Sequence, residues 1–155
     1  MKNFIALIFI FVLGMQMAFA ETLPPKGYYD VKPEDYPILF GYVEDYANKL
    51  FEDYNPSIFW APRVGPEDIY YINKDGSITE FFDEHKTDKR LKKLILSISP
   101  SPFPKELEAE KIKIHLILFK ENFNKINIYY FASRETFWIT LYKPYQRKSW
   151  FKKKK

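Results

Sequence analysis

The sequence contains no cysteine and only two histidines, and these absences exclude much nucleophilic and metal chemistry. Without thiols the chain forms no disulfide and no thiolate site. A Ser–His–Asp triad would have to use His85 or His115, and no G-x-S-x-G motif is present. Asp83, Glu84 and His85 are adjacent, and adjacent side chains converge poorly on one ion. We therefore expect a non-enzymatic protein with no catalytic residue, no metal, no cofactor and no small-molecule substrate.

Long apolar runs are absent after residue 20, and the one at the start of the chain is short. Lys2 precedes an apolar run over residues 4–13, and Ala18, Phe19 and Ala20 supply the small residues of a cleavage site. A spanning helix needs roughly 20 apolar residues. Residues 1–20 are therefore expected to form a cleaved signal peptide, with an uncleaved anchor as the alternative. Both place the rest of the chain in the periplasm or cell envelope.

Excess positive charge is confined to a C-terminal tail, residues 143–155, which has seven cations and no acid. Without these seven and Lys2, 16 basic residues stand against 20 acidic ones, so the body is mildly acidic and no nucleic-acid partner is expected. Cations beside aromatic rings suit an anionic membrane surface, and a disordered solubilising terminus is the alternative. The tail residues expected at such a surface are Arg147, Lys148, Trp150, Phe151, Lys152, Lys153, Lys154 and Lys155.

Residues 33–142 have the patterns of one domain, preceded by an extended leader at 21–32. Apolar residues between 39 and 54 recur at three- and four-residue spacing, which predicts a helix. Glu34 and Asp35 lie at its expected N-terminus, where the helix dipole favours acids. Two β-rich runs then flank Asp75-Gly76, which is typical of a hairpin turn.

A second helix is expected to start with Thr87 as its N-cap. Its predicted buried positions are Leu91, Leu94, Ile95 and Ile98. Its opposite face should be solvated, and it carries Lys89, Arg90, Lys92 and Lys93.

Three prolines, Pro100, Pro102 and Pro104, separate this helix from the most regular strand pattern. Proline has no backbone N–H and a fixed φ, so the segment ends the helix and is expected to deliver Phe103 to the core. Strict alternation over 111–119 predicts a strand, and β-like runs follow at 126–131 and 136–142. The chain is therefore predicted to be α+β, with a small antiparallel β-sheet packed against two helices and a C-terminal β extension.

The order of these elements resembles the C-terminal domain of the TonB/TolA family over about residues 36–119. The residues that carry the resemblance are Tyr42, Tyr46, Trp60, the hairpin at 72–78, Thr87, Asp88, Leu91, Pro102, Phe103, Pro104 and the strand start at 112–114. The resemblance implies an α-β-β-α-β fold that contacts an envelope or outer-membrane protein through a sheet edge. A motor-coupled transducer is not expected, because the leader spans at most about 40 Å.

An exported protein-binding module is the function that these patterns and the resemblance predict. An extended partner peptide would add a strand to the sheet, at Lys111–Phe119 or at Thr136–Tyr142. The expected contact residues on the first strand are Lys111, Lys113, His115, Ile117 and Phe119. Two alternatives stay open: the C-terminal extension covers that edge, or the protein is a membrane- or cell-wall-associated accessory protein held by its tail.

Overall fold

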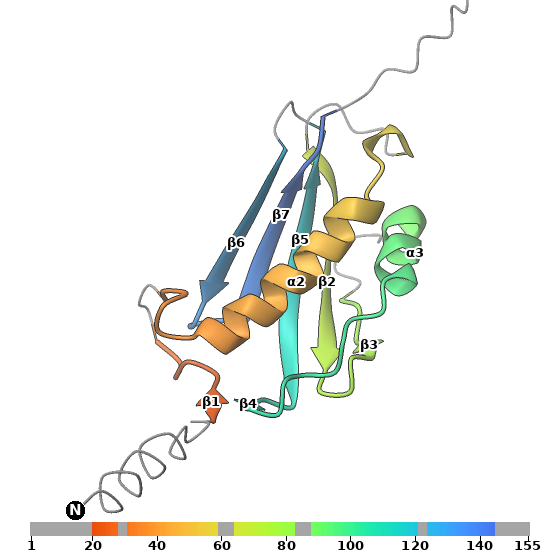
Figure 1. Cartoon of the computed structure of the whole chain (residues 1–155). Coiled ribbons are helices and arrows are strands. Elements are labelled where there is room, and N and C mark those ends of the chain that lie inside the picture. The colour runs from red at the N-terminus through yellow and green to blue at the C-terminus, as the bar shows by residue number, and fades with distance from the viewer. Residues whose placement is uncertain (1–19, 28–30, 59–63, 83–87, 121–123, 145–155) are drawn as a thin grey trace, which may run out of the picture.

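Two α-helices lie on one face of a five-stranded sheet in a computed structural model that describes residues 20–27, 31–58, 64–82, 88–120 and 124–144 (Figure 1). The predicted α+β class is confirmed. The elements are β1 (Glu21–Thr22), α2 (Pro37–Asp53), the 3-10 turn η1 (Pro56–Ile58), β2 (Val64–Asn73), β3 (Ile78–Thr79), α3 (Lys89–Ser97), β4 (Leu107–Glu108), β5 (Lys111–Phe119), β6 (Lys125–Phe131) and β7 (Thr136–Tyr142). Trp60, His85, Thr87 and most of the predicted signal peptide lie outside the described residues.

The sheet is mixed, so the prediction of a purely antiparallel sheet is wrong. Its strand order is β3-β2-β5-β7-β6. β5 runs antiparallel to β2 but parallel to β7, with His115 aligned to Trp138. The reason lies in the last hairpin. The strand that pairs with β5 is the second strand of this hairpin, β7, and not the first, β6. The chain reverses direction once between β5 and β6 and again between β6 and β7, so β7 runs parallel to β5.

The predicted alternation of β5 is confirmed and supplies the centre of the core. Its even-numbered residues from Ile112 to Leu118 are at most 2% exposed. They pack in the same core as the apolar stripe of α2, of which Leu39, Val43 and Leu50 are fully buried. Burial of each such side chain contributes about 2 kcal/mol. The helix and the sheet therefore pack together through apolar residues whose spacing is apparent in the sequence.

The N-terminus of α2 is capped by a residue from β1. The helix begins at Pro37 and has no acid in its first turn, so Glu34 and Asp35 lie before it and not in it. Instead, the Glu21 carboxylate accepts hydrogen bonds from the backbone N–H groups of Ile38 (3.1 Å) and Leu39 (2.6 Å). A carboxylate at this end satisfies free N–H groups and complements the helix dipole.

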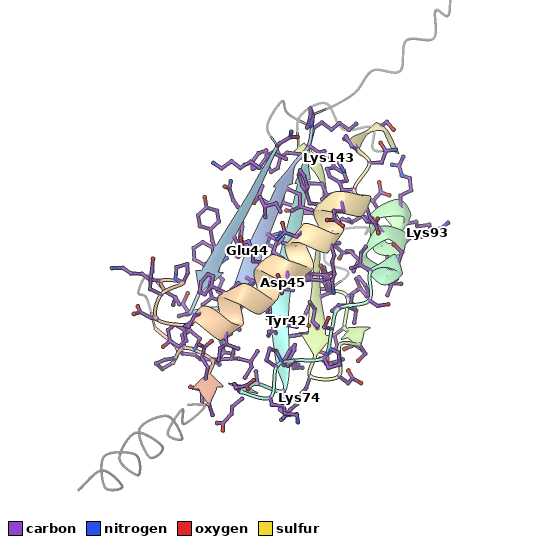
Figure 2. All side chains as sticks on the ribbon, viewed as in Figure 1. Tyr42, Glu44, Asp45, Lys74, Lys93 and Lys143 are labelled. Atoms are coloured by element: carbon purple, nitrogen blue, oxygen red, sulfur yellow. The ribbon has the colours of Figure 1, made fainter. Side chains whose placement is uncertain are left out.

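The C-terminus of α2 is capped from the other end of the chain. The Lys143 ammonium group donates to the carbonyl oxygens of Phe51 (2.8 Å) and Glu52 (3.2 Å) (Figure 2). The helix has no basic residue of its own in its last turn, so this cation is the complement to its dipole. Lys143, predicted as the start of the tail, is thus part of the folded domain.

Replacing Glu21 by alanine should lower the free energy of unfolding by about 1–2 kcal/mol, since two N–H groups lose a charged acceptor. Glu21→Gln should lose less, because the amide oxygen still accepts. Urea unfolding measures both. Glu108→Ala, an exposed carboxylate on the adjacent β4, is the matched control and should cost under about 0.5 kcal/mol. Equal losses for Glu21→Ala and Glu108→Ala would contradict the capping role.

The predicted hairpin is confirmed as β2 and β3. The proline segment, residues 100–104, packs against its turn. Gly76 has φ of +83°, and a Cβ added there would lie 2.5 Å from the Pro100 carbonyl oxygen. The Phe103 N–H donates to the Lys74 carbonyl at 2.9 Å, and the Phe103 side chain is 8% exposed. The proline segment therefore lies directly on the turn and places Phe103 in the core, as predicted.

The second helix, α3, begins one residue later than predicted. Asp88 is its N-cap, and its side chain accepts a hydrogen bond from the Arg90 N–H at 2.8 Å. Leu91 and Ile95 are fully buried, as the apolar spacing predicts, and Leu94 is partly buried. Neither α3 nor α2 is long and apolar enough to cross a membrane, and no other helix in the described residues is.

Candidate functional site at a sheet edge

Neither strand predicted as a binding edge has a free edge. β5 pairs with β2 on one side and with β7 on the other, and β7 lies between β5 and β6. Their ladders occupy the backbone N–H and C=O groups that an added strand would need. The predicted edge at Lys111–Phe119 is therefore wrong. Of the two possibilities that the sequence left open, the structure has the covered one.

The five predicted contact residues of β5 lie together on the sheet face that points away from the helices, and they alternate with the buried ones. They are Lys111, Lys113, His115, Ile117 and Phe119. The two ammonium groups lie over aromatic rings, at 4.2 Å from the Tyr71 centroid and 4.9 Å from that of Phe82. At the far end, Phe119 stacks on Tyr142 with ring centroids 4.8 Å apart. These residues form a row across the outer face, and not an edge.

His115, predicted as a contact residue, is largely covered. Its side chain is 12% exposed and shares a 3.1 Å hydrogen bond with the Glu67 carboxylate of β2. Its ring centroid lies 4.3 Å from that of Trp138 on β7. The histidine thus ties three strands together on the outer face.

The long free edge belongs to β6. All seven of its residues pair with β7, and no strand in the described part of the chain pairs with its other side. Every second residue of an antiparallel pair directs its N–H and C=O away from the partner. β6 contains no proline, and Lys125 is its single charged residue, so it lacks the usual features that block pairing at an edge.

The opposite edge of the sheet is formed by β3 and by the part of β2 that β3 leaves uncovered, because β3 pairs with only two residues of β2. β3 has two residues, and the chain leaves it at Glu80, whose φ is +53°. Glu80 also pairs with Lys111 at 3.2 Å, which places a charged pair beside that edge. The uncovered part of β2 contains a proline and two acidic residues at positions 66–68. Short strands, prolines and charges discourage strand addition. Between the two edges, β6 is the one suited to accept a peptide.

Exposed aromatic rings lie beside the β6 edge, on the outer face of the sheet. Tyr129 is 54% exposed and Phe131 is 45% exposed, whereas Tyr130 between them faces the core and is 6% exposed. The Phe131 ring contacts Trp138 of β7 edge-on, with centroids 5.5 Å apart. We call Tyr129, Phe131 and Trp138 the aromatic surface. Large exposed aromatic side chains are typical of binding surfaces.

The sequence contained a signal for this site that was not assigned to function. The run KINIYYF places Tyr129 and Phe131 in one alternation phase and Tyr130 in the other. That pattern predicts a half-exposed strand with aromatic residues on its open face. It does not state which strands lie at the edges of the sheet, because strand order depends on contacts between distant segments.

A small recess lies on the helix side, between α2 and the proline segment. Its lining residues are Tyr42, Asp45, Tyr46, Lys49 and Ser101. Its volume is about 160 Å³, smaller than the roughly 300 Å³ of ordinary ligand pockets. The Tyr42 hydroxyl donates to the Ser101 carbonyl at 2.8 Å (Figure 2). Among the described residues, no three histidines, aspartates or glutamates are grouped to hold a metal ion.

The predicted membrane-contacting residues of the tail lie outside the described residues. They are Arg147, Lys148, Trp150, Phe151 and Lys152 to Lys155. Of the predicted tail, the structure describes Lys143 and Pro144. The alternative of an accessory protein held at a membrane or cell wall by its tail therefore stays a prediction.

Comparison with known proteins finds no protein-family model, no curated protein and no solved structure that matches the chain. The resemblance to the TonB/TolA C-terminal domain therefore stays a prediction. What the fold and the site define, in the described part of the chain, is an α+β protein whose outer strand β6 has a free edge beside exposed aromatic rings. Any function has to be argued from that geometry.

Proposed function

We propose that the chain is an exported, non-enzymatic protein-binding module that accepts an extended segment of an envelope protein along β6. The single observation that carries this proposal is the free outer edge of Lys125–Phe131, next to exposed Tyr129 and Phe131. The edge offers main-chain hydrogen bonds and the aromatic surface offers apolar contacts. Strand addition combines the same two contributions: the backbone gives affinity and alternate side chains give specificity.

The partner segment would extend the sheet by one strand. Its backbone would pair with the outward N–H and C=O groups of β6, and its alternate side chains would pack beside Tyr129 and Phe131 on the outer face. Each hydrogen bond contributes about 1 kcal/mol, and each well-placed aromatic contact about the same. Four or five such contacts correspond to an affinity near the millimolar range, and a micromolar affinity needs about twice as many.

The TonB/TolA resemblance is the second support. The helix, hairpin, helix and strand follow one another in the order that it implies. The ring of Phe103 in the proline segment packs edge-on against that of Tyr42 in the first helix, with centroids 4.9 Å apart. The two added strands, β6 and β7, lie beyond the region of resemblance. In this proposal they move the binding edge from β5 to β6 and leave the mode of binding unchanged.

Export is supported by the position of Glu21. The predicted signal peptide ends at Ala20, and the next residue is the one whose carboxylate caps α2. Cleavage at that point would leave the whole described fold intact. Mass spectrometry of the exported chain tests this, and a first residue that lies after Glu21 would contradict it.

Proline substitution removes a single backbone N–H group, and it can therefore test the N–H groups that point outward from β6 apart from those that point to β7. In β6, Asn127 and Ile128 point their N–H groups in opposite directions, one to β7 and one outward. Of Asn127→Pro and Ile128→Pro, the variant that removes the outward N–H should weaken partner binding about 10–100-fold with little loss of stability. The other should destabilise the fold.

Peptides selected against the full chain from a random library provide the binding assay, read by fluorescence anisotropy. Asn127→Ser and Ile128→Val keep the N–H groups and serve as matched controls that retain binding. If the folded proline variant that lacks the outward N–H binds as well as its control, the edge mechanism is excluded.

A further inference from the structure

The exposed face of α3 combines cations with an uncovered leucine. Five side chains at positions i, i+3, i+4, i+7 and i+8 line one open depression: Lys89, Lys92, Lys93, Leu96 and Ser97. This spacing is a single helical stripe. It lies opposite the buried stripe of Leu91 and Ile95, so α3 is apolar toward the core and basic toward the outside.

Leu96 is 53% exposed, although the other leucines of α3 contribute to the core. It lies at the C-terminal end of the stripe, beside Lys92 and Lys93. The Lys92 ammonium group lies 4.4 Å over the Phe81 ring, so its stem follows apolar surface while its charge stays outside. An apolar centre with a basic rim is the arrangement that suits an interface between water and lipid.

The charge of this stripe is not balanced by the described residues around it. In the described ranges none of Lys89, Lys92 and Lys93 forms an ion pair, and the nearby Asp88 is paired with Arg90 at 2.7 Å. Burial and the charge of Arg90 lower the pKa of Lys120 at the end of β5, so a further cation lies close by. The partner that complements this face is therefore anionic.

We propose that the exposed stripe of α3 binds the surface of an anionic phospholipid bilayer, with Leu96 inserted between head groups and the three lysines on phosphates. An acidic protein or polymer would satisfy the lysines but leave Leu96 unused. The site is separate from the β6 edge, because α3 packs on the β2 side of the sheet and β6 is the opposite outer strand (Figure 1). A bilayer on α3 leaves that edge open to a partner.

The absence of cysteine allows a test at one position. Leu96→Cys in the full chain, labelled with an environment-sensitive fluorophore, should brighten several-fold with equimolar phosphatidylglycerol–phosphatidylcholine vesicles, and not with phosphatidylcholine alone. Lys74→Cys reports the turn of the β2–β3 hairpin, which lies below α3 in the view of Figure 2, and should not change. The fluorophore responds only to the surroundings of position 96. Binding through the tail or the N-terminal segment without contact of α3 with lipid should therefore not brighten it.

Charge reversal then measures the contribution of the lysines. In the chain labelled at position 96, Lys89→Glu with Lys93→Glu should weaken vesicle binding about 20-fold. Lys74→Glu with Lys105→Glu makes the same change in net charge at exposed sites and should leave binding close to that of the parent. The proposal is overturned if position 96 does not brighten, if position 74 brightens equally, or if soluble polyphosphate alone gives the same response.

Discussion

Raising the pH from about 9 to about 11 should cost the folded chain about 3 kcal/mol through two buried tyrosines that resist ionisation. Tyr46 is 2% exposed and Tyr70 is fully buried. Burial raises the pKa of both above the ordinary value of 10.0. Unfolded tyrosines ionise near that value, whereas the folded ones stay neutral. Their contribution is therefore complete below pH 10 and is lost as the pH rises above it.

A double substitution isolates this pair. The two hydroxyl oxygens lie 2.7 Å apart and share one hydrogen bond, so Tyr46→Phe with Tyr70→Phe removes both ionisable groups together. The alkaline loss, measured by guanidinium chloride unfolding at both pH values, should shrink by about 3 kcal/mol in this variant. A loss of similar size should persist, since burial also raises the pKa of Tyr42 and raises that of Tyr54 to about 12. An unchanged alkaline loss in the double variant would refute the role of the pair.

Gly76→Ala should lower the free energy of unfolding by about 2–4 kcal/mol. The positive φ of +83° disfavours any side chain, and the new Cβ would lie 2.5 Å from the Pro100 carbonyl oxygen. That oxygen belongs to a proline-rich backbone that cannot easily shift. The substitution should therefore disturb both the hairpin turn and the segment that places Phe103 in the core.

Gly41→Ala is the matched control, because nothing lies within 4 Å of a Cβ added at this exposed position of α2. Alanine is the better helix former, so this variant should gain about 0.5–1 kcal/mol. Urea unfolding of the two variants should give changes of opposite sign. Losses of similar size at both positions would mean that the contact with Pro100 is not decisive.

The local elements were predictable because their determinants lie close together in the sequence. Alternation defined β5, Asp75-Gly76 defined the hairpin, and the apolar spacing defined both helices. The caps of α2 were not predictable in this way. Glu21 is 17 residues from its nearer partner and Lys143 is 92 residues from Phe51, and no local pattern links them.

The edge of the sheet was mispredicted for the same physical reason. A strand pattern states which side chains are buried, and it does not state which strand lies beside it. β5 would have a free edge if the chain ended after Phe119, but β7 pairs along it from Thr136 to Tyr142. The sequence could therefore predict a partner-binding function, whereas the proposal that β6 is the binding edge required the three-dimensional strand order.

Amide hydrogen exchange of the chain with and without a bound peptide tests the central claim most directly. Binding along β6 should slow exchange about 100-fold at every second residue of Lys125–Phe131, because those N–H groups become hydrogen-bonded. The amides of β5, already paired on both sides, should not change. Protection that appears elsewhere and leaves β6 unchanged would contradict the proposal that this edge is the binding site.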